Sequence, residues 1–188
     1  MPPPHWAVPF DCREAAALAR RYAEGESYQP GVSNAEADQR IAAYMERAHR
    51  RGYLFKTDLR EVARWKYRGP KLRQLLSENA AEDVRECSQV AFAAEGERLR
   101  IGALMALRGI GAPVATTILH FVFPKRYPVL DVRALRTIGA PPGYVFERWL
   151  EYAAFCRDAA PDYGGSLWKL DRSLWQYDRE RKGQASVL

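Results

Sequence analysis

Apolar residues recur at every third or fourth position along most of the chain, which is the period of an α-helix that buries one face. Alternating β-branched residues between turn dipeptides, the pattern of strands, are almost absent. The sequence therefore predicts an all-α fold. Two stripes show the helical period most clearly: Ile41, Tyr44, Met45 and Ala48, and Leu167, Leu170 and Leu174.

Residues that can cap a helix mark where these elements begin. Asp11 with Glu14, and Ser33 with Glu36, have the spacing of a capping box, in which side chains satisfy free N–H groups of the first turn. Thr57 can cap a third helix. Further apolar faces begin at Leu72 and at Ile101, where Leu104 and Met105 complete the face, and helices are predicted over residues 57–67, 80–94, 98–107, 132–138, 145–158 and 167–179.

The length of 188 residues and the hydrophobic content of 47% allow one sizeable core. We expect a single compact helical unit, or two lobes with the functional site between them. The chain has no run of eighteen apolar residues and no signal-peptide pattern at its start, so we expect a monomeric cytoplasmic protein that does not associate with membranes.

Three widely separated cysteines, Cys12, Cys87 and Cys156, lack the paired spacing of a disulfide framework or of a zinc or iron-sulfur site. We expect buried free thiols, with no metal and no cofactor. The net charge of +6 favours a polyanionic partner, because each phosphate that Lys or Arg neutralises releases counterions.

The segment over residues 98–139 is the most informative, because a predicted helix runs there into a Gly-Ile-Gly turn. Gly109 and Gly111 can adopt positive φ and leave backbone N–H groups unobstructed, so the turn can hold a phosphate. Pro113 suits the first turn of the next helix, whose N-terminus adds a favourable field for an anion. A hairpin of this kind can equally be a simple packing element, so both interpretations stay open.

The string LRGIGAPVATTILHFVFPKRYPVLDVRALR, residues 107–136, resembles the helix-hairpin-helix superfamily of DNA glycosylases, which includes endonuclease III and the adenine-mismatch glycosylases. Gly109 and Gly111 match the glycines of the family's hairpin, and Asp131 matches its catalytic aspartate. Ala115 and Arg136 match a small residue of the following helix and the arginine after the aspartate. The resemblance implies a two-lobed helical glycosylase fold that acts at the nucleoid on duplex DNA with a modified or damaged base.

The resemblance also implies a reaction. Asp131 would stabilise the oxocarbenium-like transition state of N-glycosidic hydrolysis and orient the attacking water. The same position suits a plain helix N-cap, and the two roles are compatible. Bifunctional members carry a lysine where this chain has Pro113, so we expect a monofunctional enzyme that leaves an abasic site. Cys156 is the one cysteine of the C-terminal half, so the iron-sulfur cluster of some members is not expected.

Other candidate contacts follow from sequence position. We expect phosphate contacts from the hairpin and from basic residues near it or near Asp131, namely Arg108, Gly109, Ile110, Gly111, Lys125, Arg126 and Arg133. Base flipping also needs a wedge or a pocket, for which the candidates are Trp65, Tyr67 and His120. For Trp65 and His120 a place in the core is the more common role. Trp168 and Trp175 are expected in the core.

Three functions stay open at this point. The first is base excision by a DNA glycosylase, either in repair or in defence against phage DNA that carries modified bases. The second is a non-catalytic helix-hairpin-helix protein that binds DNA and uses Asp131 only as a cap. The third is a structural or partner-binding helical domain whose positive charge is incidental.

Overall fold

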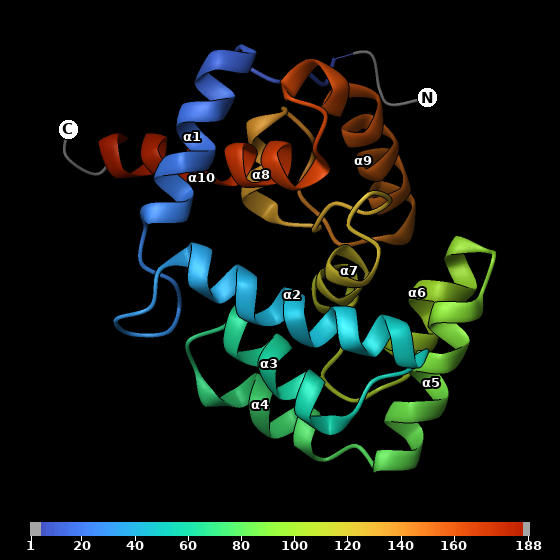
Figure 1. Ribbon diagram of the computed structural model, residues 1–188. Coiled ribbons are helices and arrows are strands. Elements are labelled where there is room, and N and C mark those ends of the chain that lie inside the picture. The colour runs from blue at the N-terminus through green and yellow to red at the C-terminus, as the bar shows by residue number, and fades with distance from the viewer. Residues whose placement is uncertain (1–4, 186–188) are drawn as a thin grey trace. The chain divides into compact units, whose positions relative to one another are not determined.

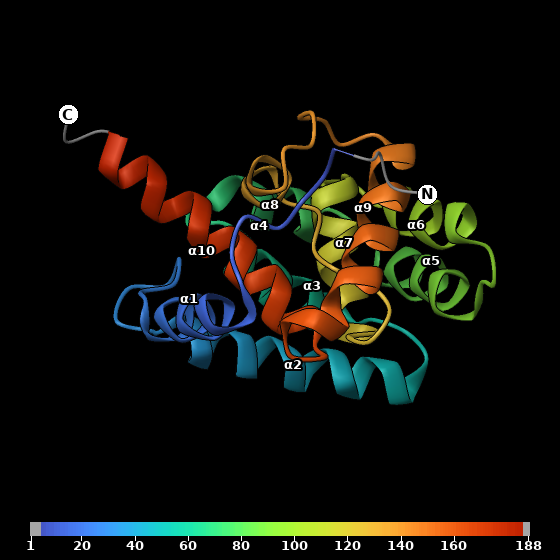
Figure 2. The same cartoon turned by 90° about the horizontal axis from the view of Figure 1, so that it is seen from above.

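The computed structural model describes residues 5–185, which form ten α-helices and one short 3₁₀-helix and contain no strand (Figures 1 and 2). An isolated bridge pairs Glu26 with Ser33. The all-α prediction is therefore confirmed. The chain forms two compact units, one made of the residues up to Gly25 together with those from Phe123 onward, and the other of Glu26–Val122.

The first unit is built around its C-terminal helix, α10, which packs against each of the unit's other helices. These elements are α1 (Cys12–Glu24), α8 (Val132–Thr137), α9 (Phe146–Ala159), the 3₁₀-helix η1 (Ala160–Tyr163) and α10 (Leu167–Ala185). The predicted leucine stripe of α10 is buried, and the core of the unit contains Ala15, Leu18, Tyr22, Leu135, Trp149, Tyr152, Phe155, Leu167, Leu170 and Leu174.

The two tryptophans of α10 are only partly buried, which corrects their assignment to the core. The edge of the Trp175 ring meets Tyr22, and the guanidinium groups of Arg133 and Arg179 lie 5.2 and 5.3 Å from its centroid. Trp168 has the guanidinium of Arg172 at 5.8 Å. Both rings therefore line the edge of the leucine stripe, where cations cover them.

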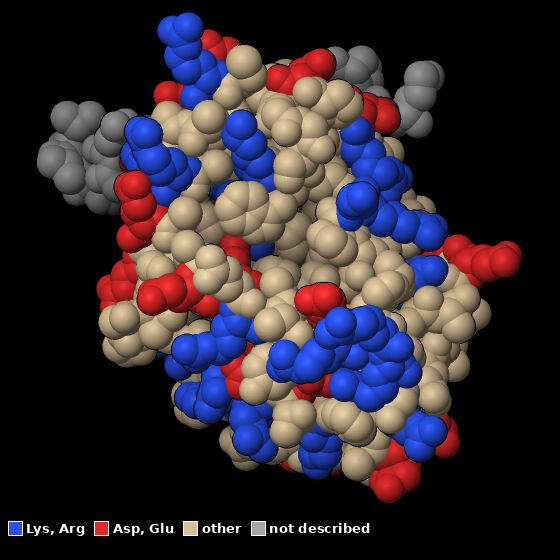
Figure 3. Space-filling model, in the orientation of Figure 1, with Lys and Arg blue, Asp and Glu red and all other residues tan. Residues whose placement is uncertain are grey.

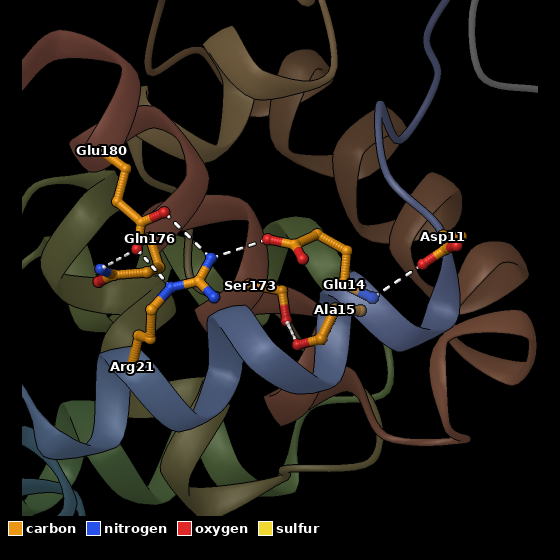
Figure 4. Close-up of polar contacts among 7 residues, drawn as sticks. All are labelled: Asp11, Glu14, Ala15, Arg21, Ser173, Gln176 and Glu180. Atoms are coloured by element: carbon orange, nitrogen blue, oxygen red, sulfur yellow. Dashed lines mark hydrogen bonds and ion pairs between the residues drawn. The ribbon is translucent and has the colours of Figure 1, made fainter. Parts of the chain in front are cut away.

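Polar contacts join α1 to α10 (Figure 4). Nε of Arg21 donates to Glu180 at 2.8 Å, and the Gln176 amide donates to the same carboxylate at 2.8 Å. The buried hydroxyl of Ser173 donates to the carbonyl of Ala15 at 2.8 Å. Because the Arg21 and Glu180 side chains are 38% and 35% exposed, their ion pair contributes on the order of 1 kcal/mol. We call these contacts the clamp between α1 and α10, and they mainly set the orientation of α1 on α10.

The second unit holds the six helices α2 (Asn34–Arg51), α3 (Lys56–Lys66), α4 (Pro70–Ser77), α5 (Ala81–Ala93), α6 (Glu97–Met105) and α7 (Ala112–Val122). α2 packs against α3 and α7, α4 packs against α3, and α5 pairs with α6. Ile41, Met45 and Ala48 of the predicted stripe are buried, while Tyr44 lies at its edge. Every residue of α7 except Pro113 is buried, so α7 is the central helix of this unit.

A buried arginine closes the turn between α5 and α6. Arg100 is 5% exposed, and its guanidinium donates to the carbonyls of Ala91 at 3.0 Å and Phe92 at 3.2 Å, and also to that of Ala94. No backbone N–H group of α5 can donate to these carbonyls, because they lie at the C-terminal end of the helix. A cation at a helix C-terminus is also favourable electrostatically, so Arg100 stabilises the end of α5.

The predicted helix starts are confirmed at two positions. Ser33 and Glu36 form a complete capping box, in which Ser33 Oγ accepts the Glu36 N–H at 3.2 Å and the Glu36 carboxylate accepts the Ser33 N–H at 2.8 Å. Asp11 accepts the Glu14 N–H at 2.8 Å. The Glu14 side chain binds Arg21 at 2.7 Å, so this second box is only half formed.

Two local predictions are wrong. α3 begins at Lys56, one residue before Thr57, and the carboxylate of Asp58 satisfies its start by accepting the Phe55 N–H at 2.7 Å. Arg51 donates to the same oxygen of Asp58, Oδ2, that accepts the Phe55 N–H. Met105, expected on the buried face of α6, is 45% exposed because the helix ends at this residue.

The clamp between α1 and α10 makes stability depend on pH. The hydrogen bond from Arg21 holds the pKa of Glu180 below its usual value near 4.5, against the opposing effect of burial. A carboxylate whose pKa is lowered by folding stabilises the fold fully above its unfolded pKa, and that contribution is lost as the pH falls through the folded value.

We therefore predict that Glu180→Gln lowers the free energy of unfolding at neutral pH by about 1 kcal/mol, and that the variant loses less stability than the parent when the pH is lowered below the usual pKa of a glutamate. Urea denaturation at neutral and acid pH measures both effects. Glu46→Gln is the control, because its pairing with Arg50 joins two side chains that are each 68% exposed. An identical acid loss in the parent and in Glu180→Gln would contradict the prediction.

Candidate nucleic-acid interface

The turn between α6 and α7 has the conformation that its glycines suggest, although the two glycines differ. Gly109 has a φ of +83°, in the left-handed region, and the Ile110 N–H donates to the Leu107 carbonyl at 3.1 Å. Gly111 is not in the left-handed region, and its carbonyl accepts the N–H groups of Val114 and Ala115, each at 3.0 Å. Gly111 therefore starts α7, and Pro113 occupies the first turn as predicted.

Gly109 also lies against α4 so closely that no side chain fits. A Cβ atom added to Gly109 would be 2.8 Å from Cβ of Leu75 and 3.4 Å from a methyl carbon of Leu76. The nearest atom to a Cβ at Gly111 is Cδ of Pro113, at 3.9 Å, and Gly111 is exposed. The first glycine is thus required by packing, whereas the second leaves backbone accessible at the surface.

Asn79, which the sequence did not single out, holds the turn in place. Its amide oxygen accepts the Arg108 N–H at 2.7 Å, and its amide nitrogen donates to the Arg108 carbonyl at 3.0 Å and to the Leu76 carbonyl at 3.1 Å. Asn79 is 8% exposed, so these bonds are shielded from water. One side chain therefore ties the hairpin to the end of α4, and no local pattern signals a pairing across 29 positions.

The side chains of the hairpin face different environments. Ile110 is buried, whereas the Arg108 side chain is 67% exposed and its Nε lies 2.9 Å from a carboxylate oxygen of Glu78. An ion pair this exposed is weak. Breaking the contact between Arg108 and Glu78 therefore costs little free energy, which leaves Arg108 available for a phosphate.

Two of the three candidates for a wedge or base pocket pack on the same ring in this unit. Trp65 and His120 each meet Phe121 in an edge contact, with centroids 5.2 and 4.9 Å apart. Trp65 Nε1 also donates to Asp38 at 2.6 Å, and His120 is fully buried. Tyr67 caps the end of α3 and is 48% exposed. Of the three, Tyr67 is thus the one at the surface.

Asp131 belongs to the other unit, where it caps α8. Its Oδ1 accepts the Arg133 N–H at 2.9 Å, and its backbone is extended. The four residues before it, 127–130, are all buried, and the Tyr127 ring stacks on Trp149 with centroids 5.5 Å apart. This stack holds the start of the segment that leads to Asp131. Asp131 itself is partly exposed at the end of a rigid segment.

Arg133 and Arg136 both bind Asp178 of α10. Nη1 of Arg133 lies 3.1 Å from Asp178 Oδ2, and Arg136 makes a two-pronged contact at 2.8 Å to each oxygen. Burial alone would raise the pKa of Asp178, but the hydrogen bonds and charges of the two arginines outweigh it and lower the pKa. The Arg133 guanidinium, expected at a phosphate, is thus engaged within its own unit.

Lys125 and Arg126 lie on the exposed loop that follows α7. The Arg126 guanidinium is 5.2 Å from the centroid of the Tyr127 ring, and the Arg126 carbonyl accepts a bond from Arg157 at 3.1 Å. Both cations can reach solvent from a loop whose backbone is held, which fits the expected contact with phosphate.

A buried polar network lies in the same unit as Asp131. The hydroxyl of Tyr152 donates to Asp171 at 3.3 Å, and Arg172 binds the same carboxylate at 2.5 Å. Burial raises the pKa of Tyr152 well above its ordinary value, and the charges near it, including those of Asp171 and Asp131, add to the shift. The pKa of Cys156 is also raised, chiefly by burial. Tyr152 therefore stays protonated near the candidate catalytic carboxylate.

The predicted residues thus divide between the units. The hairpin, Trp65, Tyr67 and His120 belong to the second unit, while Lys125, Arg126, Asp131 and Arg133 belong to the first. Sequence analysis missed Asn79, Phe121 and Asp178, whose roles depend on partners distant in the chain.

The cysteines of the described chain are free, but their environments differ. Cys156 is buried, Cys87 is partly exposed and Cys12 is exposed, so the expectation of buried thiols is correct for one of the three. In the part of the chain that the structure describes, no three His, Cys, Asp or Glu side chains gather as a metal site would require. Among the same residues, no helix has both the length and the apolar character needed to cross a membrane.

Comparison with known proteins found no family model that matches the chain, and no matching curated protein or solved structure.

The different environments of the two glycines generate a prediction. Gly109→Ala should lower the free energy of unfolding by about 2–4 kcal/mol, because it adds left-handed strain to a clash with Leu75. Gly111→Ala should change it by less than about 0.5 kcal/mol. Urea denaturation of both variants measures the difference, and equal losses would show that the turn does not pack as described.

Proposed function

We propose that the protein is a monofunctional DNA glycosylase of the helix-hairpin-helix type, which hydrolyses the N-glycosidic bond of a flipped base. The observation that carries the proposal is Asp131, a partly exposed carboxylate at the N-terminus of α8. The four residues before it, 127–130, are buried and hold it in place. A carboxylate fixed in this way needs little reorganisation when positive charge develops beside it.

The proposed reaction breaks the bond between C1′ of the deoxyribose and the base nitrogen. The base leaves with the electron pair of that bond, and the sugar acquires oxocarbenium character that the negative charge of Asp131 stabilises. Water adds to C1′ and Asp131 accepts a proton from it, while the departing base takes up a proton from solvent, to which Asp131 then releases its own. The products are the free base and an abasic site.

The hairpin supplies DNA binding in this proposal. The exposed backbone at Gly111 and the N-terminus of α7 suit a phosphate, and the exposed Arg108 side chain adds charge beside them. Lys125 and Arg126 provide further exposed cations. These contacts are not specific for sequence, so they would position DNA without selecting the base.

Asp131→Asn tests the catalytic role with little effect on the fold, because asparagine is also a good N-cap. We predict that the variant keeps its free energy of unfolding within about 0.5 kcal/mol and loses base release by a factor of about 100 or more. The assay incubates the protein with DNAs that contain different oxidised, alkylated, mismatched and naturally hypermodified bases, and detects free base by mass spectrometry.

Asp158→Asn serves as the control, because Asp158 is an exposed aspartate of the same unit. It should release base as the parent does. Unchanged release by Asp131→Asn would remove Asp131 from the mechanism. The base that is released would also separate the two biological roles, since a hypermodified base indicates defence against foreign DNA and a damaged base indicates repair.

Pro113, at the place of the lyase lysine, leads to a separate prediction. It carries no amine that could attack the sugar, so no Schiff base should form and the strand should stay intact after base release. Borohydride reduction during the reaction should therefore leave no covalent adduct between protein and DNA on a denaturing gel. An adduct on substrate DNA would show that the enzyme is bifunctional.

A second candidate function is DNA binding without catalysis. It is favoured by the capping bond that Asp131 makes to Arg133 and by the engagement of Arg133 with Asp178, since both are satisfied without a substrate. Failure to release base from the whole panel, together with salt-sensitive duplex binding by the parent and by Asp131→Asn, would support this function over the glycosylase.

A further inference from the structure

A cluster of arginines and aromatic rings lies where α2 ends and α3 begins, in the second unit. Arg51 packs on Phe55 at 4.0 Å and on Tyr53 at 5.1 Å from the ring centroids, and Arg85 of α5 packs on Tyr53 at 4.9 Å. The Tyr53 and Phe55 rings meet edge to face, 5.3 Å apart. One turn back on α2, Arg47 lies 4.5 Å from the Tyr44 ring. We call these six residues the arginine–aromatic cluster.

Arg51 gives the cluster a fixed shape. Its Nε donates to the Tyr53 carbonyl at 3.0 Å, its Nη2 binds Asp58, and the side chain is only 21% exposed. Asp58 is buried and also holds the Phe55 N–H. The backbone that carries the Phe55 ring is therefore held by the Arg51–Asp58 ion pair, yet Phe55 itself is 49% exposed. What distinguishes Phe55 from the other exposed hydrophobic residues is that its ring contacts a fixed guanidinium and a second aromatic ring.

Unlike Arg51, three arginines of the C-terminal half of α2 and of α5 are exposed. Figure 3 shows Lys and Arg side chains gathered over the C-terminal half of α2. Arg47, Arg50 and Arg85 are exposed, and the contact of Arg50 with Glu46 is long, at 3.7 Å, and 68% exposed on both sides. Glu82, Asp83 and Glu86 flank Arg85 on α5. The positive charge is thus concentrated on the α2 side, beside Phe55.

The cluster adjoins the hairpin through the end of α4. Lys56, next to Phe55, donates to the Ser77 carbonyl at 2.9 Å, and the following residue, Glu78, pairs with Arg108.

We propose that the arginine–aromatic cluster binds unpaired nucleotides, with a base stacked on Phe55 and the flanking phosphates on Arg47 and Arg85. Every base has a π-face, so an exposed aromatic ring among cations binds single strands with little sequence preference. An acidic peptide would satisfy the arginines but would leave the Phe55 ring without a stacking partner. This inference does not require catalysis by Asp131, so its failure and that of the glycosylase proposal are separable.

The test is fluorescence anisotropy of a short labelled oligo(dT) with the full chain. Phe55→Leu, which keeps apolar bulk but loses the ring, should weaken binding about tenfold, and Phe55→Trp should restore it. Tyr28→Leu is the matched control, because Tyr28 is 44% exposed in the same unit and lies outside the cluster. Circular dichroism confirms that each variant is folded.

A second measurement separates phosphate contacts from stacking. Arg47→Gln and Arg85→Gln should each reduce the slope of log affinity against log salt by about 0.7, whereas Arg13→Gln, exposed in the other unit, should leave it unchanged. The proposal is overturned if the parent does not bind oligo(dT), or if Phe55→Leu binds it as tightly as the parent. It is also overturned if a competitor without bases, either a base-free phosphodiester strand or poly-glutamate, displaces the labelled oligo(dT) as effectively as unlabelled oligo(dT) does.

Discussion

A helix of six residues is too short to be stable by itself, so the position of Asp131 depends on what α8 packs against. The contact that decides it is the carboxylate of Asp178, which binds Arg133 near the start of α8 and Arg136 near its end. Thr137 adds a bond to the Leu174 carbonyl at 2.8 Å. A helix from the far end of the chain thus locates the candidate catalytic residue, and the first unit is organised by α10.

This arrangement engages the arginines of α8 within their own unit. The cation closest in sequence to Asp131 is committed to Asp178 and lies beside the Trp175 ring, so it stabilises the scaffold. Lys125 and Arg126 are exposed instead, on the loop before the buried segment 127–130. Under the proposed function, different residues would therefore position the carboxylate and attract DNA.

Features decided within a few residues were predictable from the sequence. The Ser33 capping box, the left-handed Gly109 and the capping role of Asp131 each have a signature within a few residues of the chain. The start of α3 was predicted wrongly from Thr57, because the Phe55 N–H is satisfied by Asp58 of the first turn, whose carboxylate also binds Arg51, seven positions earlier. The same holds for the candidate site, where the hairpin and Asp131 follow from spacing while their supports at Asn79 and Asp178 are long-range contacts.

Asn79 acts in the hairpin as an additional peptide group would, since its amide pairs with both the N–H and the carbonyl of Arg108. The turn is consequently held by α4 as well as by its own hydrogen bond from Ile110 to Leu107. Opening it exposes two partly buried hydrogen bonds together with the contact between Gly109 and Leu75, so we expect the hairpin and the end of α4 to open together. The exchange of the Arg108 amide proton with solvent then reports on the integrity of α4, 29 positions earlier in the chain.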